Sequence, residues 1–479
     1  MRPVEGEQRE HAVVESEGSD LAAAGRHQVR SSGHRFTLWL LVLAAEAVYL
    51  GFLWLPDARR RLPAYLLLAA AAGLLSLLAA AILSASRPGF LLLCAALFRA
   101  TLLWRAPDLS DDIHRYLWDA RVASSGISPW ARAPEDPVLE GLDPALSARV
   151  AHREIRTVYP PVAEAAFRAG SLGGESLPAL KALFVAADVA IVWLLARRGS
   201  GAAAALYAFH PLPVLEVAGQ GHLDPLGVAL LLASLAFLSA RRPLSAGVSF
   251  ALSVLTKYVS LAAVIPIARA GRWRLVLSGA AVAAAVWFLS ARGGASPAGG
   301  LAEYAGRWEF NSALYPTAVR LVRSADLPAR AKSAFLDGKE RLGHPAWAQS
   351  VFPYFSDGFF ARAALGTVLL LLLAAIGWRV RDPRTATFAS LCALLLFSPT
   401  LHPWYLLWTL PFAAERREPA FLYLSFAVPL SYGLLHPTPG LSRPLIFGLQ
   451  YLPFALLLAG TLLKARRRAR AACPAGVAP

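Results

Sequence analysis

Apolar runs of about 15–22 residues recur along almost the whole chain and constrain its fold more than any other feature. A helix needs about 20 such residues to cross the hydrocarbon core of a bilayer. Of the 479 residues, 56% are hydrophobic and only 16% are charged, whereas soluble domains carry about 25% charge. The sequence therefore predicts an all-α fold, a polytopic transmembrane helical bundle.

The runs predict about 12–13 spans, including one broken, re-entrant pair. Spans are expected near 36–55, 64–83, 89–104, 177–196, 202–217, 225–240, 275–291, 359–378, 385–401, 421–435 and 445–463, with a short helix at 405–414. The broken pair is expected at 244–255 and 259–268, because Thr256, Lys257 and Tyr258 interrupt it. Such breaks are tolerated only where they line a cavity, so Lys257 is expected to face one.

Three parts of the chain follow from this pattern. Residues 1–35 are polar and of mixed charge, which predicts a disordered cytoplasmic tail. Residues 36–463 form the transmembrane domain, with two large external loops at 105–176 and 292–358. Residues 464–479 form a basic cytoplasmic tail.

The net charge of +16 fits a membrane protein better than a nucleic-acid-binding one, and no nucleic-acid partner is expected. Arg pairs and triplets lie in the short connections, which is typical of the cytoplasmic side. This places both termini in the cytoplasm and both long loops outside, and we expect a multi-pass protein of the bacterial inner (plasma) membrane. One connection disagrees, because Arg59, Arg60 and Arg61 fall on the external side.

The first external loop carries a dense polar string. Ser110 followed by Asp111 and Asp112 is a helix start signal. The string continues through Arg115, Tyr116, Trp118 and Asp119 on adjacent helix faces. Paired carboxylates can act as a base and its orienter or hold a cation, but they can also merely favour the helix N-terminus. Both interpretations remain open from this segment alone.

Further polar and aromatic residues interrupt apolar runs on the same predicted face. They are Trp130, Tyr159, His222, Asp224, Glu309, Asn311, His402 and Trp404. Each alone could be a rigid lead, a solvated turn or a membrane-interface aromatic; together they favour a site. Lys257 would bind a phosphate group in an outward cavity, or else form an internal salt bridge with Asp188.

Cysteine usage is sparse. Cys94 and Cys392 lie inside apolar runs and Cys473 lies far from both, which predicts neither a disulfide framework nor a thiolate metal site. Asp111 and Asp112 could hold Mg²⁺ or Mn²⁺, but departure of a monophosphate does not require a metal. We expect no metal and no other cofactor.

Several strings together resemble the bacterial GT-C superfamily of membrane glycosyltransferases. They are the run from Ser110 to Asp119, Gly126–Trp130, Tyr159-Pro160-Pro161, Gly221–Asp224, Trp308–Asn311 and His402–Tyr405. The chain is most similar to enzymes that use polyprenyl-phosphate sugars, including polyprenol-phosphate-mannose-dependent mannosyltransferases. Two departures affect sugar and acceptor identity: Asp119-Ala120 replaces an expected Asp-Gly, and Ser128-Pro129-Trp130 replaces an expected Asn-Pro-Tyr.

The resemblance implies transfer of a hexose, with a mannose-like sugar favoured, from a polyprenyl-phosphate donor to a cell-envelope glycan or lipid acceptor. It implies a base in the first loop, Asp112 in preference to Asp111. Lys257, His402 and Arg115 would bind the donor phosphate. The sugar and acceptor would contact Tyr116, Trp118, Asp119, Trp130, Tyr159, His222, Asp224, Glu309, Asn311 and Trp404.

Two alternatives remain at this stage. A lipid-linked saccharide flippase would also contain many spans and broken helices, although no internal repeat is visible in the sequence. An O-antigen ligase-like enzyme would take a diphosphate-linked glycan instead. A nucleotide-sugar enzyme is disfavoured, because no Gly-x-Gly-x-x-Gly stretch follows a predicted strand.

Overall fold

The computed structural model describes residues 36–174, 176–291, 295–341 and 346–471. Within these ranges all regular elements are helices, and the β-structure consists of one isolated bridge between Phe310 and Thr400. The predicted all-α bundle is confirmed. The predicted tail 1–35 and Cys473 lie outside the described residues. The last helix continues to Ala471, so it includes the first residues of the predicted C-terminal tail.

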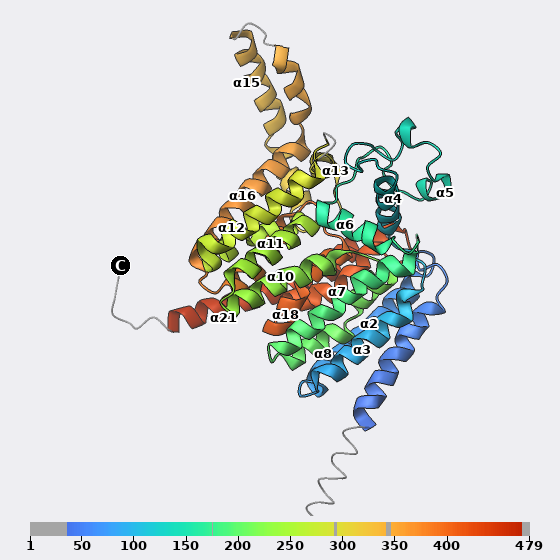
Figure 1. Cartoon of the computed structure of the whole chain (residues 1–479). Helices are drawn as coiled ribbons and strands as arrows, with labels where there is room; N and C mark the ends of the chain where they lie inside the picture. Colours follow the sequence, from blue (N-terminus) through green and yellow to red (C-terminus); the bar gives the residue numbers. More distant parts are fainter. Residues whose placement is uncertain (1–35, 175, 292–294, 342–345, 472–479) are drawn as a thin grey trace, which may run out of the picture.

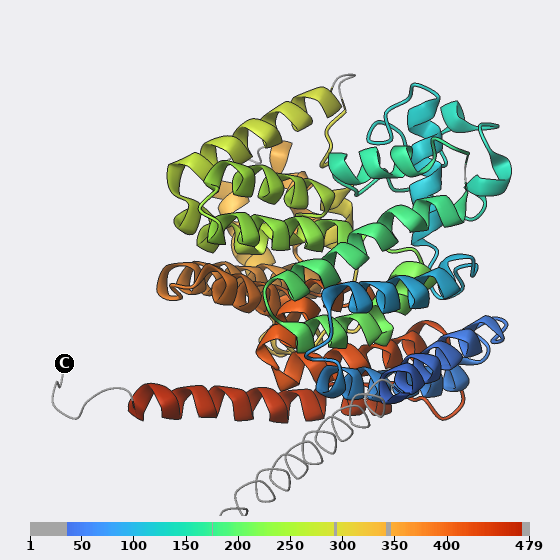
Figure 2. The same cartoon turned by 60° about the horizontal axis from the view of Figure 1, so that its bottom comes forward.

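Six helical stretches are long and apolar enough to cross a membrane, or seven with a bent pair counted as one span. They are the first helix Phe36–Leu53, α2 Leu62–Ile82, α7 Leu177–Arg197, the continuous stretch Tyr258–Ser290, α16 Asp357–Arg379, and Arg443–Arg467 within α21 Arg443–Ala471. Five apolar helical stretches are shorter: α3 Pro88–Leu103, α10 Asp224–Ser239, α11 Pro243–Thr256, α17 Pro383–Phe397 and Pro419–Leu435. The predicted number of spans is reached only when these shorter helices are included. Figures 1 and 2 show the helices side by side in one bundle.

The bent pair lies where the sequence analysis expected one straight span at 202–217. Helix α8 Gly201–Phe209 is followed by α9 Pro211–Pro213 and the π-helical turn η2 Val214–Gly219, at an angle of 47°. Arg99 Nη1 donates to the carbonyl of Ala208 at 2.8 Å, and Tyr49 donates to that of Phe209 at 2.7 Å. These bonds satisfy carbonyls that the break leaves without helical partners, which a membrane interior requires.

A second break occurs at Lys257, where the sequence predicted one. Helix α11 ends at Thr256, and Lys257 is extended, with φ −157° and ψ 130°. The chain continues as η3 Tyr258–Ala263 and α12 Val264–Ser290, and α12 kinks at Arg272. The second arm of the predicted pair and the predicted span from 275 are thus parts of one continuous stretch.

The two long connections form a layer at one end of the bundle (Figure 1). The first contains α4 Asp112–Ser124, η1 Pro137–Leu139, α5 Pro144–Ser147 and α6 Pro161–Gly170. The second contains α13 Leu301–Arg307, α14 Tyr315–Ser324, α15 Leu327–Arg341 and η4 Ala346–Tyr354, and α15 stands out from the rest (Figure 1). The chain returns to this end at η5 Pro403–Trp408, before α18 Leu410–Arg416.

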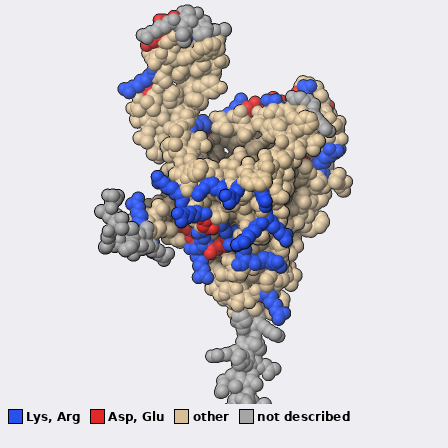
Figure 3. Space-filling model, turned by 60° about the vertical axis from the view of Figure 1, so that its left-hand side comes forward, with Lys and Arg blue, Asp and Glu red and all other residues tan. Residues whose placement is uncertain are grey.

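The opposite end of the bundle is rich in arginine. Figure 3 shows Lys and Arg side chains gathered over the lower part of one face, around a few acidic ones. Glu415 lies within 3.4 Å of Arg198 and 2.6 Å of Arg384, so two helix connections meet there. Arg59 lies instead beside the first long loop, pairing with Asp111 at 2.8 Å.

Candidate active site

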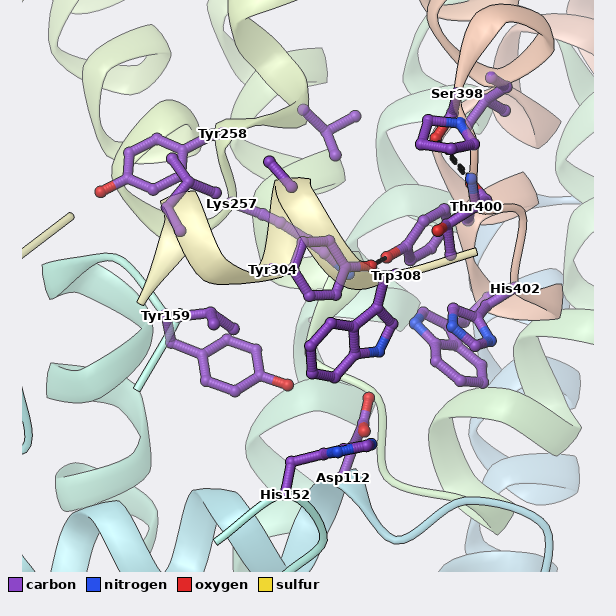
Figure 4. A pocket seen from close by; sticks show the side chains of 18 of the residues that line it. Asp112, His152, Tyr159, Lys257, Tyr258, Tyr304, Trp308, Ser398, Thr400 and His402 are labelled. Carbon is purple, nitrogen blue, oxygen red and sulfur yellow. Dashed lines mark hydrogen bonds between the residues drawn. The ribbon is translucent and has the colours of Figure 1, made fainter. Parts of the chain in front are cut away.

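A cavity of about 760 Å³ lies beneath the layer of loops. Its wall combines the start of α4, the break at Lys257, α13, one side of α16 and the segment 394–405. Figure 4 shows Asp112 pointing into the space below Trp308, with Tyr159 on one side and His402 on the other. Two breaks in regular structure, at 105–111 and at Lys257, bring these polar groups to one place.

Neither carboxylate of the Asp111–Asp112 pair caps helix α4. Asp111 stands at the N-cap position, but its side chain accepts no capping hydrogen bond. Its Oδ1 atom accepts from Arg59 Nη2 at 2.8 Å. Asp112 Oδ2 lies 3.6 Å from His222 Nδ1. Each side chain therefore has a neighbour outside α4, Arg59 for Asp111 and His222 for Asp112.

The surroundings of Asp112 adjust its acidity towards neutral pH. Burial raises the pKa of this carboxyl to about 6, with Asp224 and Asp111 also raising it and Lys257 and Arg115 lowering it. The side chain is 37% exposed, and it lines the cavity. A carboxylate with a pKa close to the working pH is suited to take a proton from a hydroxyl group.

Lys257 has a buried acidic partner. Its Nζ atom lies 2.7 Å from Asp224 Oδ1, which also accepts from Trp408 Nε1 at 2.6 Å. Asp224 is fully buried, whereas the Lys257 side chain keeps 17% exposure on the cavity wall. The sequence offered an internal salt bridge as one of two roles for Lys257, but it named Asp188 as the partner. Asp188 pairs with Arg99 at 2.6 Å instead.

Arg115 and His402 offer further hydrogen-bond donors to the cavity. Arg115 Nε donates to Asp119 at 2.9 Å and Nη1 to the carbonyl of Ile155, while Nη2 is buried and has no partner among the described residues. Burial and then Lys257 lower the pKa of His402 to about 3. His402 is therefore neutral, and it can contact a phosphate only through a neutral hydrogen bond.

Four rings form a continuous stack beside the cavity. Phe310 lies 4.6 Å from His402, His402 lies 4.4 Å from Trp404, and Trp404 lies 3.8 Å from His222, between ring centroids. Interplanar angles of 6–18° make these contacts nearly parallel. The stack fixes the orientation of both imidazoles.

The structure brings together seven of the residues that the sequence singled out. Asp111, Asp112, Arg115, Tyr159, Lys257, His402 and Trp404 line the cavity. Four more support that wall from behind: Asp224 and His222, Asp119 through Arg115, and Trp130, whose Nε1 donates to the carbonyl of Tyr159 at 2.9 Å.

The remaining predicted residues do not line this cavity, although Tyr116 lies 5.0 Å from Tyr159 between ring centroids and Glu309 pairs with Arg362 at 2.7 Å. Tyr116 is buried and stacks on Phe167 at 4.3 Å. Trp118 belongs to a small core with Val122, Leu139 and Val150 that holds the first loop together. Glu309 and Asn311 line a second cavity of about 320 Å³, to which Phe310 also contributes.

Other wall residues were not among the predicted site residues. Trp308 and Tyr405 belong to strings that carry the resemblance, and Tyr258 lies at the predicted break. The sequence analysis gave no site role to the others, which include Arg59, His152, Arg156, Tyr304, Tyr315 and Arg362. Arg59 did carry a signal, because its arginine triplet falls on the side predicted to be external, where arginine is depleted. His152, Arg156, Tyr304, Tyr315 and Arg362 stand in no such pattern.

No group of three or more His, Cys, Asp or Glu side chains arranged to hold a metal ion occurs in the described part of the chain. Cys94 and Cys392 are both free and buried.

Two family models match the chain. Residues 158–399, about half of the chain, match Glycosyltransferase family 87, and residues 358–464 match the MptB C-terminal domain. No curated protein and no solved structure matches. The matched ranges include Tyr159, Lys257 and His402, whereas the string from Ser110 to Asp119 lies outside both. The resemblance drawn from the motifs is confirmed, and the chain belongs to glycosyltransferase family 87 as a multi-pass membrane glycosyltransferase with an MptB-like C-terminal domain.

Proposed function

We propose that this protein transfers a hexose, with mannose favoured, from a polyprenyl-phosphate donor to a cell-envelope glycan or lipid acceptor. The proposal rests chiefly on one observation: a carboxylate with a pKa of about 6 and the cation of Lys257 line the same cavity. Asp112 is the base that deprotonates the acceptor hydroxyl, and Asp111 is the alternative. MptB is a polyprenol-phosphate-mannose-dependent mannosyltransferase, which supports mannose here.

The departing phosphate requires positive charge or hydrogen-bond donors. Lys257 supplies charge, although Asp224 neutralises part of it, and the free Nη2 of Arg115 supplies a directed donor. Neutral His402 adds a hydrogen bond. The aromatic rings of Tyr159, Trp404 and Trp308 offer flat faces for a sugar ring or the first prenyl units.

One stripe of α16 supports a lipid donor. Arg362, Leu365, Gly366 and Leu369 all line the cavity, and their spacing puts them on one face of the helix. Arg362 lies at the loop end of this stripe, where its Nη2 atom pairs with Glu309 Oε1 at 2.7 Å and its Nε atom is buried and unpartnered among the described residues. A cation above an apolar groove fits a phosphate head with a hydrocarbon chain. Only 6% of the membrane-length window of α16 is buried, so the groove adjoins the lipid.

We place the cavity on the external face and both termini in the cytoplasm. The support is the clustering of arginine at the end of the bundle opposite the cavity (Figure 3). Reporter fusions after Arg198 and Arg242 should score cytoplasmic, and one near Glu140 should score external. A cytoplasmic score at Glu140 would put the acidic loop in the wrong compartment and refute this orientation.

A purified-protein assay tests the reaction. Wild-type protein in detergent or liposomes is given polyprenyl-phosphate mannose and envelope extracts, and release of polyprenyl phosphate is measured together with sugar transfer. Asp112→Asn should lower turnover by about 10²–10⁴-fold, because the amide cannot take a proton. Release of a diphosphate carrier from a diphosphate-linked glycan would favour the O-antigen ligase-like alternative. Movement of an intact lipid-linked sugar without bond cleavage would favour the flippase.

A further inference from the structure

The proposed base is backed by a buried histidine between two carboxylates. His222 is fully buried, with Nδ1 3.6 Å from Asp112 Oδ2 and Nε2 3.5 Å from Glu216 Oε2. Neither ring nitrogen has a hydrogen-bond partner elsewhere in the described ranges. Leaving two buried imidazole nitrogens unpaired costs about 1–3 kcal/mol, so a role for this ring beyond packing is expected.

Neighbouring side chains fix the positions of His222 and Glu216 behind Asp112. Trp404 stacks on the imidazole, with ring centroids 3.8 Å apart and an interplanar angle of 17°. Tyr432 donates to both oxygens of Glu216, at 2.8 and 2.9 Å. Glu216 lies in the π-helical turn η2 and is buried there, 3.5 Å from His222 Nε2. The break in the bent helix pair therefore serves the site.

We propose that His222 and Glu216 form a proton relay behind Asp112, with His222 as a positioning residue and proton carrier. The proposal rests on the glycosyl transfer proposed above. The acceptor oxygen bonds to the anomeric carbon, the bond from that carbon to the phosphate oxygen breaks, and the electron pair leaves with the phosphate. The hydroxyl proton goes to Asp112 Oδ2.

The relay then restores the base. In molecules whose Glu216 is ionised before turnover, Asp112 passes its proton to His222 Nδ1, and the proton on His222 Nε2 moves to the Glu216 carboxylate. When products leave, the proton returns through the same ring to the departing phosphate or to water. Distances of 3.5–3.6 Å are a few tenths of an ångström longer than hydrogen bonds, and catalytic contacts often shorten once substrate is bound.

The charges around the His222 ring disfavour a lasting imidazolium, so this ring is suited to pass a proton on. Lys257 and His402 face His222 from the cavity wall and, after burial, lower its pKa well below the usual value. Asp224 lies behind Lys257, and Asp111 lies next to Asp112. An imidazolium is thus disfavoured between turnovers, and a proton that reaches Nδ1 is passed on.

The chain provides a matched control in His210. Like His222 it is fully buried and stacks flat on an aromatic ring, here Phe426 at 4.2 Å. Its ring nitrogens are already occupied, since Nε2 lies 3.0 Å from Ser425 Oγ and Nδ1 accepts from Leu212 N at 3.1 Å. His210→Gln therefore measures the cost of replacing a buried stacked imidazole that contacts neither Asp112 nor Glu216, and the Gln amide oxygen can still accept from Leu212 N at the bend before η2.

The test compares His222→Gln, Glu216→Gln and His210→Gln with wild type, using polyprenyl-phosphate mannose. The relay variants should lose about 10–100-fold in kcat with donor KM unchanged, while His210→Gln keeps its kcat. At fixed pH, kcat of His222→Gln should rise with imidazole buffer concentration, because the small base takes the proton from Asp112. A merely structural role would not give buffer-dependent turnover.

Each outcome decides the matter. If His222→Gln keeps wild-type kcat, or loses activity that buffer does not restore while its folding is normal, the relay is wrong and the glycosyl transfer stands. Folding is judged by the thermal midpoint relative to His210→Gln. If His222→Gln does not fold, Glu216→Gln alone carries the test, and an unchanged kcat there refutes the relay. If wild-type protein does not release polyprenyl phosphate, the proposed function itself fails.

Discussion

The ion pair between Lys257 and Asp224 makes the sharpest prediction about stability. Lys257→Met leaves the fully buried Asp224 carboxylate with Trp408 as its only hydrogen-bond donor among the described residues. Its Oδ2 atom has no partner there even in the wild-type protein. Breaking a buried pair from one side costs about 3–5 kcal/mol, because a buried charge is left uncompensated. The 17% exposure of Lys257 puts the expected loss near the lower end of that range.

The reciprocal change should be milder. In Asp224→Asn the amide oxygen still accepts from Trp408, and the Lys257 ammonium can draw on water in the cavity. We expect a loss of about 1–3 kcal/mol. The double variant removes both charges and should be more stable than Lys257→Met alone, with a coupling energy of about 2–3 kcal/mol.

The assay is thermal unfolding of the four proteins in one detergent, together with the donor KM of each. If the two single losses add in the double variant, the pair does not behave as a buried salt bridge and the reasoning is refuted. The donor KM distinguishes phosphate binding by Lys257 from its structural role in the ion pair. A double variant that regains stability but keeps a raised donor KM supports phosphate binding, whereas recovery of both leaves Lys257 with a structural role only.

Three other predictions follow from the cavity. The kcat/KM for transfer should rise with pH through a midpoint near 6, since Asp112 acts as a base only when ionised and its pKa is about 6; a flat profile between pH 5 and pH 7 would exclude it. Asp111→Asn should reduce turnover less than Asp112→Asn, because Asp111 pairs with Arg59; the reverse order would move the base to Asp111. Arg362→Met should raise the KM for a long-chain donor about tenfold, worth about 1.4 kcal/mol, with kcat kept; an unchanged KM would remove the phosphate contact.

Apolar run length and arginine placement were readable from the sequence because both depend on local composition. The bilayer imposes a fixed thickness on each helix, and water cannot satisfy a broken backbone inside it. The sequence thereby indicated the helical bundle, the two long loops and the break at Lys257. The order of the motifs likewise indicated a membrane glycosyltransferase similar to the GT-C superfamily.

The bend at His210 was signalled locally but was not predicted. The run at 202–217 contains Pro211 and Pro213, which break a helix. The bonds that satisfy the carbonyls at the bend come from Arg99 and Tyr49, 109 and 160 residues away. The partner of Lys257 was uncertain for a different reason. Asp188 and Asp224 both stand in or beside apolar helices, and only helix packing decides which carboxylate meets which cation.

By itself, the sequence of this protein determined a membrane-embedded helical glycosyltransferase with its acidic loop and its lysine at one end. Only the tertiary structure decided that Asp112 faces the cavity, that Asp111 is held by Arg59, and that His222 stands between two carboxylates. The physical reason is that spans follow from the thickness of the membrane, which acts on each segment separately. The site depends on distances between side chains from separate segments, such as Asp112 and His222, and the packing of the whole bundle sets these distances.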